Sequence, residues 1–182
     1  MKPINKFCNI LRKRSKDHST AIERLKDLPG MMMSIIRQEL DSMVRVIYLL
    51  SISDLSERER LISQTLNGEK WTVLTKNGKY KNVTDRDMVE LSNKLEGWTL
   101  SAYKFGCSFI HLSNYHDYSK ENPFVLLPKE ERENILKHMR YYHGGPLSDE
   151  PSFAEFSRYF PEVFKKISGN LECNIEDLEN EN

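Results

Sequence analysis

Apolar residues recur every three or four positions between residues 33 and 50, at Met33, Ile36, Leu40, Met43, Ile47 and Leu50. This spacing places them on one face of an α-helix. Arg37, Asp41 and Arg45 fall on the opposite face at intervals of four, where opposite charges stabilise a helix. Because a long apolar helix face must be covered by another element, the pattern predicts a fold of packed helices.

A second apolar stripe steps by three and four from residue 88 to residue 112, through Met88, Leu91, Leu95, Trp98, Ala102, Phe105, Phe109 and Leu112. Thr84, followed by Asp87, is typical of a helix N-terminus. We predict one long helix over 84–116 at the centre of the fold. Further helices are expected over 4–28, from 56 to Leu66, after Pro128 as far as Gly144, and as a pair of short helices bent at Pro161.

Residues 71–83 break the helical pattern, because WTVLT and YKNVT flank the segment Lys76-Asn77-Gly78-Lys79. Two alternating runs about an Asn-Gly pair are a strong signal for a β-hairpin. Two strands alone are marginally stable, so we expect a small excursion on a helical body. The predicted fold class is mainly α, an antiparallel bundle of five or six helices with a small β-hairpin near 71–83.

The length of 182 residues suits one domain, and its two ends carry opposite charge. Residues 1–26 hold eight basic residues against two acidic ones, whereas residues 172–182 hold five acidic residues and no basic one. We therefore expect a single helical domain over residues 1–170 with a basic N-terminal segment, followed by an acidic tail over residues 171–182.

The composition favours a cytoplasmic protein. The mean hydropathy is −0.61, and the longest apolar run, Val46 to Leu50, is far shorter than the roughly 20 residues of a membrane span. The N-terminus lacks the apolar core of a secretory signal. Cys8, Cys107 and Cys173 are odd in number and form no CxxC pair, which argues against disulfides and against a cysteine zinc site.

The basic segment is a candidate for nucleic-acid binding. Arg12, Lys13, Arg14 and Lys16 form a short cluster, and Lys104 adds a base beside the second apolar stripe. A basic arm of this kind binds phosphate groups. The other interpretation is a solvated helix face, since no aromatic residues are interleaved with the cluster.

Four of the five histidines form two pairs with the same spacing, His111 with His116 and His138 with His143. On a continuous helix His111 would share a polar face with Asn114 and Tyr118, and His116 would lie about 140° away. The two imidazoles of the first pair converge only if the helix loosens near Ser113, or if a second subunit supplies one of them.

The segment FGCSFIHLSNYHDYSKENPF resembles the motif region of HEPN proteins, which are helical-bundle ribonucleases and their inactive relatives. That family carries Arg-x4–6-His at the end of a long helix, and one branch continues as His-x-Tyr. His116-Asp117-Tyr118 matches this last element, whereas His111 occupies the position of the family's arginine. The resemblance implies a metal-independent endoribonuclease of the toxin or phage-defence type, without a cofactor.

The resemblance also implies roles for the catalytic candidates His111, Asn114, His116 and Tyr118. His116 would transfer protons to and from the ribose 2′-hydroxyl and the leaving oxygen. His111 as imidazolium would stabilise the charge that the arginine stabilises in the family. Asn114 would position one of the imidazoles, and Tyr118 would donate to phosphate.

Several alternatives remain open. His116-Asp117-Tyr118-Ser119-Lys120 is also similar to the HDxGK element of HD-domain phosphohydrolases, but two of that family's four metal ligands are missing. A zinc site from both histidine pairs is conceivable, and so is a purely structural role at helix ends. The alternative function is a non-catalytic module that binds RNA or protein. We also expect a homodimer, because the two apolar stripes exceed what a thin bundle needs to cover.

Overall fold

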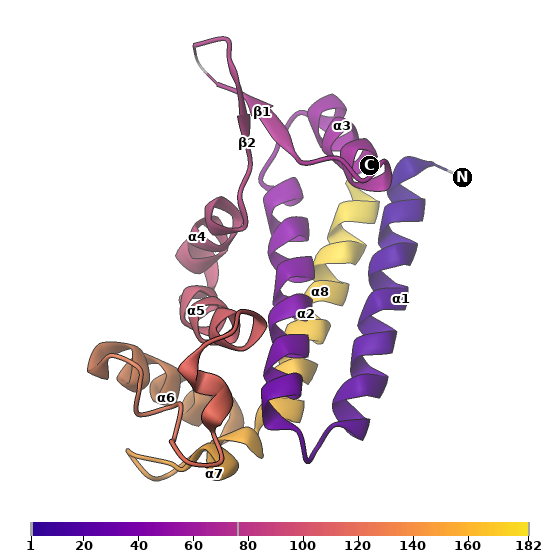
Figure 1. Cartoon of the computed structure of the whole chain (residues 1–182). Helices are drawn as coiled ribbons and strands as arrows, with labels where there is room; N and C mark the ends of the chain where they lie inside the picture. Colours follow the sequence, from indigo (N-terminus) through magenta and orange to yellow (C-terminus); the bar gives the residue numbers. More distant parts are fainter. Residues whose placement is uncertain (1, 76, 182) are drawn as a thin grey trace.

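The computed structural model describes residues 2–75 and 77–181, and helices dominate it (Figure 1). The fold is mainly α with one small hairpin, as predicted. In chain order the elements are α1 (Pro3–Arg24), α2 (Pro29–Leu50), α3 (Leu55–Leu66), β1 (Thr72–Leu74), β2 (Tyr80–Asn82), α4 (Asp85–Glu96), α5 (Thr99–Ile110), the 3-10 helix η1 (Asn114–Asp117), α6 (Lys129–His143), α7 (Phe153–Ser157) and α8 (Phe160–Asn180).

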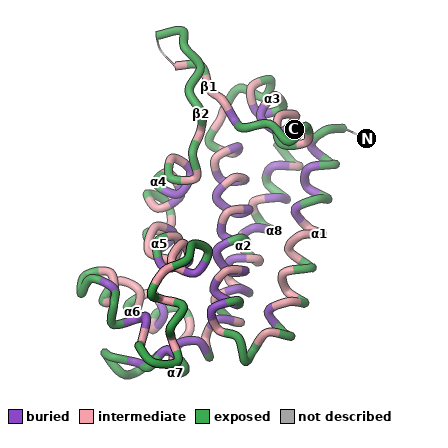
Figure 2. Tube along the Cα trace, viewed as in Figure 1, coloured by how far each residue is buried: buried purple, intermediate pink, exposed green. Residues whose placement is uncertain are grey.

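Three long helices, α1, α2 and α8, lie side by side and form the main body of the molecule (Figure 1). α1 runs antiparallel to the other two, but α2 and α8 run parallel, so the bundle is not antiparallel throughout. α2 also packs against α4 and α5, and 14 of its 22 residues are buried (Figure 2). The centre of the fold is therefore α2 and not the predicted helix over 84–116.

The prediction of one helix over 84–116 is wrong, because the chain breaks at Gly97 and again at His111. Thr84 and Asp87 form a reciprocal capping box that starts α4, as expected. Gly97 then adopts a left-handed conformation with φ of 75°, which ends α4 before α5 begins at Thr99. Apolar residues on both sides of this break are buried, because α4 and α5 both pack against α2, but Leu95 directly before the break is exposed. The described part of the chain consequently has more helices than the five or six predicted.

The C-terminal segment belongs to a packed helix. Pro161 lies in the first turn of α8, where its missing N–H is not needed, so one long helix starts there. α8 continues to Asn180 and buries Leu171, Ile175 and Leu178 against the bundle. Residues 171–180, which we expected in an acidic tail, therefore belong to α8, and α8 packs against both α2 and α1.

The hairpin is short and projects from one end of the bundle (Figure 1). β1 and β2 pair antiparallel with Thr72 opposite Asn82, and Gly78 in the connecting turn has a φ of 73°. Lys76 of the predicted turn lies outside the described residues. Arg60 and Gln64 of α3 bind Thr72 and hold the hairpin against the helices. Within the described residues, no helix combines the length and the apolar character that crossing a membrane requires.

Candidate functional site

His111 lies at the C-terminus of α5, where the backbone leaves the helical conformation. Its φ and ψ of −95° and 144° are those of an extended residue, although its N–H still bonds to the carbonyl of Cys107. The hydroxyl of Ser113 turns back and donates to the carbonyl of Ser108 at 2.7 Å, which holds the chain away from a further helical turn. The break frees the imidazole to line a cleft between α5, α2 and α1.

This cleft, called here the arginine cleft, brings together charges from four helices. It is lined by Arg14 of α1, by Arg37, Gln38, Asp41 and Arg45 of α2, by Asp85 of α4, and by Tyr103, Cys107, Ile110 and His111 at α5. The ladder of Arg37, Asp41 and Arg45 predicted from the sequence is thus present, but it faces a cleft between helices and not open solvent.

The aspartates of the arginine cleft hold the arginines with unequal strength. Arg45 donates from Nε to Asp41 at 3.1 Å and from Nη2 to Asp85 at 3.0 Å. Nη2 of Arg37 lies 3.5 Å from Asp85, and Nη1 of Arg14 lies 4.0 Å from Asp41. Three guanidinium groups face two carboxylates, so the cleft keeps an excess of positive charge.

Arg37 forms the floor of the arginine cleft. Only 5% of the residue is exposed, and its guanidinium carbon lies 4.0 Å from the ring centroid of Tyr103. Its Nε has no hydrogen-bond partner among the residues that the structure describes. Gly106 permits this arrangement, because a Cβ atom there would lie 2.7 Å from the Cβ of Arg37. Burial raises the pKa of the Tyr103 phenol, which therefore stays a neutral hydroxyl at pH 7.

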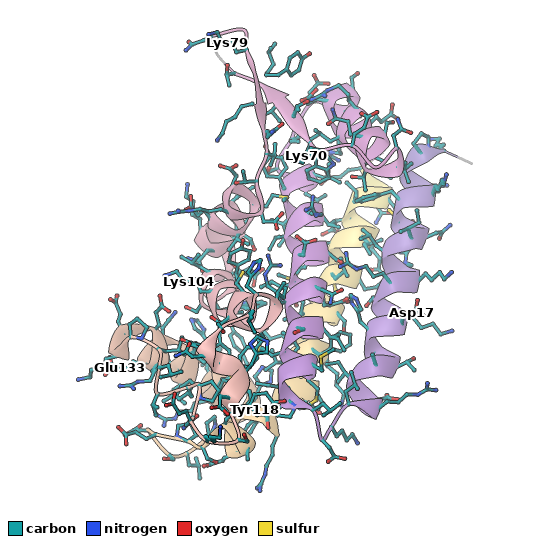
Figure 3. All side chains as sticks on the ribbon, in the orientation of Figure 1. Asp17, Lys70, Lys79, Lys104, Tyr118 and Glu133 are labelled. Atoms are coloured by element: carbon teal, nitrogen blue, oxygen red, sulfur yellow. The ribbon has the colours of Figure 1, made fainter. Side chains whose placement is uncertain are left out.

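The other catalytic candidates lie elsewhere. His116 sits in η1, exposed, with its Nδ1 3.2 Å from the carbonyl of Ser113 and its ring 6.0 Å from that of Phe109. Asn114 opens η1 and is exposed. Tyr118 packs against Phe153 and beside Gly30, and it lines a hollow next to the turn between α1 and α2 (Figure 3). The arginine cleft includes His111 but none of these three residues.

The predicted basic cluster is divided among different faces of α1. Arg12 faces α8, where it binds Glu172 through Nε at 2.8 Å and Glu179 through Nη1 at 2.9 Å, and this hydrogen bonding lowers the pKa of Glu179. Arg14 faces the arginine cleft, while Lys13 and Lys16 point outward and are exposed. Lys104 is exposed on α5 and pairs with Glu131 (Figure 3).

Two charged clusters could not be predicted from the sequence, because their members lie on different helices and meet only in the folded structure. Asp85 and Tyr103 join the arginine cleft only through the packing of α4 and α5 on α2. Glu39 is fully buried in α2, where it accepts from Ser15 and bonds to Nδ1 of His18 at 2.6 Å. Among residues 2–75 and 77–181, no group of three or more His, Cys, Asp or Glu side chains has the arrangement of a metal site.

Comparisons of the chain with family models, with curated proteins and with solved structures gave no match.

Proposed function

We propose that the protein binds single-stranded RNA through the arginine cleft. The observation that carries this proposal is the convergence of Arg14, Arg37 and Arg45 with His111 beside a neutral tyrosine ring. Guanidinium groups bind phosphate in a bidentate manner, and aromatic rings beside them stack on unpaired bases. This is the RNA-binding alternative raised by the sequence, with its site moved from the outer face of α1 to the cleft.

The electrostatics of α1 support the same proposal. Lys13 and Lys16 are exposed and form no ion pair within the described residues, so they add long-range attraction near the cleft without lining it. Arg14 is the most available guanidinium, because its nearest carboxylate is 4.0 Å away and its side chain is 37% exposed. An RNA phosphate at the mouth of the arginine cleft would pair with the guanidinium of Arg14, which Asp41 holds only weakly.

The test is the affinity for a fluorescein-labelled ten-nucleotide uridine RNA, measured by polarisation between 50 and 300 mM salt. Replacing Arg14 by Gln removes one charge-assisted contact, so we expect about tenfold weaker binding. The slope of log affinity against log salt should fall by about 0.7. Lys13→Gln is the matched control on the same helix, and its effect should be much smaller. Equal effects of the two variants, or no binding by the wild type at low salt, would refute the proposal.

Metal-independent cleavage of the bound RNA is the second candidate function, and one observation favours it. His111 lines the same cleft as the arginines, which unites an imidazole and guanidinium groups, the two residue types of the HEPN motif. In this reaction the 2′-oxygen attacks phosphorus and loses its proton to an imidazole. The bond to the 5′-oxygen breaks, that oxygen takes up a proton, and a 2′,3′-cyclic phosphate results. The arginines would stabilise the charge of the phosphorane.

Cleavage is tested with end-labelled RNA in excess EDTA, using the wild type, His111→Ala and His116→Ala. If His111 transfers the proton, its loss should lower the rate by about 10² to 10⁴-fold, and the loss of His116 should change it much less. Activity that survives in both variants would exclude this site. If the wild type binds RNA but does not cleave it, RNA binding remains as the only function of the cleft.

The remaining expectations stay predictions. A role in a toxin or phage-defence system and a place in the cytoplasm both rest on the resemblance and on composition. The prediction of a homodimer rested on apolar helix faces that a thin bundle would leave uncovered. Most of the residues in the two stripes are buried within the single chain, although Leu95 and Leu112 are exposed.

A further inference from the structure

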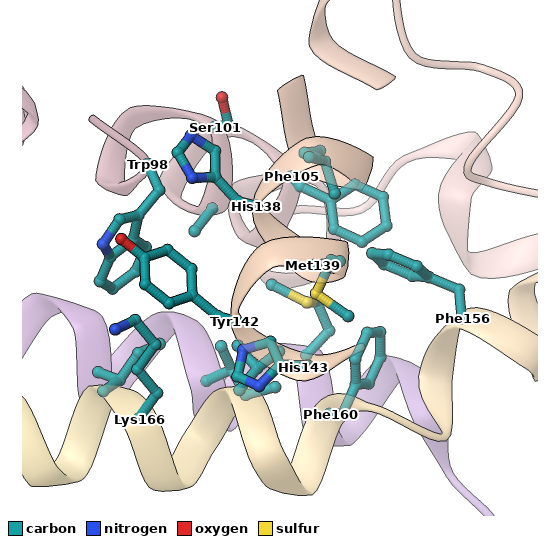
Figure 4. A pocket seen from close by; sticks show the side chains of 16 residues that line it. Trp98, Ser101, Phe105, His138, Met139, Tyr142, His143, Phe156, Phe160 and Lys166 are labelled. Carbon is teal, nitrogen blue, oxygen red and sulfur yellow. The ribbon is translucent and has the colours of Figure 1, made fainter. Parts of the chain in front are cut away.

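A second hollow lies between α5, α6 and α8, on the side of α5 opposite the arginine cleft (Figure 4). Residues 101, 102 and 105 of α5 face it, whereas residues 103, 107 and 110 face the arginine cleft, as helical periodicity requires. Its volume is about 70 Å³, and it opens to the surface. One water needs about 10–15 Å³ on this measure, so the hollow has room for an apolar group of several atoms.

The interior of the hollow is apolar and largely aromatic. Phe105, Phe156 and Phe160 form its inner wall, with Met139 between them (Figure 4). All four side chains are buried in the core. Aromatic rings and a thioether sulfur pack well against another aromatic ring, in edge or offset contacts. The lining therefore favours a ring over a flexible chain.

The mouth of the hollow carries a lysine without an acidic partner. The Nζ of Lys166 lies 3.8 Å from the ring centroid of Tyr142 and 6.0 Å from that of Trp98. Within the described part of the chain, no carboxylate lies within ion-pairing distance of it. The neighbouring Lys165, by contrast, pairs with Glu162 at 2.8 Å. Figure 4 shows the Lys166 amine beside Tyr142 and Trp98 at the edge of the hollow.

The other charges around the mouth are mostly basic. α6 supplies Lys137, His138 and His143, and α8 supplies Lys166 with the Lys165–Glu162 pair. Glu96, the last residue of α4, accepts a hydrogen bond from the Trp98 indole at 3.2 Å. Burial lowers the pKa of both imidazoles, and the charge of Lys166 lowers it further, so both are neutral at pH 7.

We propose that this hollow binds a small aromatic carboxylate, with one edge of the ring against the apolar lining and the carboxylate against Lys166. The apolar wall accounts for the ring, and the unpaired ammonium at the mouth accounts for the anion. A bound carboxylate also favours the protonated forms of His138 and His143. Binding therefore tightens as the pH falls below about 6.5, while the ligand itself stays ionised. The site is independent of the RNA proposal.

The test is calorimetric titration with phenylacetate, beside the matched alcohol 2-phenylethanol and the matched amine phenethylamine. We expect phenylacetate to bind at least fivefold more tightly than the alcohol and the amine not to bind. Lys166→Met keeps the aliphatic stem and removes the charge, so it should abolish the preference for the acid. Lys165→Met is the control on the adjacent position, and it should leave the preference unchanged.

A second variant locates the site. Ala102→Leu adds methyl groups to the wall of the hollow and should weaken phenylacetate binding at least tenfold, with an unchanged circular dichroism spectrum. Equal affinities for acid, alcohol and amine would overturn the proposal, and so would tight phenylacetate binding by folded Ala102→Leu. If that variant does not fold, an unchanged affinity of Lys166→Met for phenylacetate is sufficient to overturn it.

Discussion

At the scale of single residues, Glu39 shows how a charge is kept inside this bundle. Its side chain is fully buried, and Ser15 and His18 of α1 satisfy both carboxylate oxygens. Removal of one partner from a buried charged pair costs about 3–5 kcal/mol. We therefore expect His18→Ala to lower the free energy of unfolding in urea by about that amount. Lys16→Ala, exposed on the same helix, should change it by less than about 0.5 kcal/mol. Equal effects would contradict the burial of Glu39.

The histidines of α6 give stability a pH dependence with a definite sign. Burial lowers the pKa of His138 and His143 in the folded protein. As the pH falls below about 6.5, the unfolded chain takes up protons at these positions that the folded chain does not. Stability is therefore fully present above about pH 7 and declines toward pH 5. Urea unfolding of the His138→Gln, His143→Gln double variant should show a smaller decline than the wild type. Identical declines would refute this assignment.

At the scale of elements, Gly97 decides whether residues 84–116 form one helix or two. Its φ of 75° suits glycine, and no atom lies within 4 Å of an added Cβ. In this left-handed conformation Gly97→Ala should lower the free energy of unfolding by about 1 kcal/mol. Within a continuous helix the same substitution would raise the free energy of unfolding by about 1 kcal/mol. Gly169→Ala, with equally open space inside α8, is the control and should be stabilising. A stabilising Gly97→Ala would support the single helix.

Local chemistry explains which elements were predictable. The capping box of Thr84 and Asp87, the Asn-Gly turn and the proline and glycine limits of α6 depend on residues close in the chain, and all of them are as expected. The break at Gly97 was not predicted, because apolar residues continue at helical spacing on both sides of it in the sequence, whereas in the structure Leu95 is exposed. For His111, the sequence indicated only that the helix could loosen near Ser113, and it did not indicate that His111 lines the arginine cleft.

At the scale of the whole molecule, the opposite charges of the two chain ends meet within the fold. Arg12 of α1 binds Glu172 and Glu179 of α8, and Glu181 beside the C-terminus binds Arg58 of α3 at 3.0 Å. The sequence shows these charges but not their pairing, which depends on α8 packing beside α1. The arginine cleft is unpredictable for the same reason, since Arg14, Arg37 and His111 meet only through tertiary packing.

Deletion of residues 171–182 tests the role of this helix end. Leu171, Ile175 and Leu178 are buried, and each contributes about 1.5–3 kcal/mol. The sum is comparable to the whole stability of a small domain. We expect the truncated chain to lose its cooperative thermal transition. The full chain with Glu176→Gln and Asp177→Gln, which removes charge but no apolar contact, should keep it. A truncated chain that melts like the wild type would show that the segment is a dispensable tail.

The most direct measurement of the RNA proposal is the location of bound RNA on the folded protein. Ten-nucleotide RNA with 4-thiouridine is photocrosslinked to the wild type, and the modified residues are identified by mass spectrometry. We predict crosslinks at Tyr103, Cys107 and His111, whose side chains line the arginine cleft, and their loss in Arg14→Gln but not in Lys13→Gln. Crosslinks confined to the outer face of α1, or unchanged in Arg14→Gln, would contradict binding in the cleft.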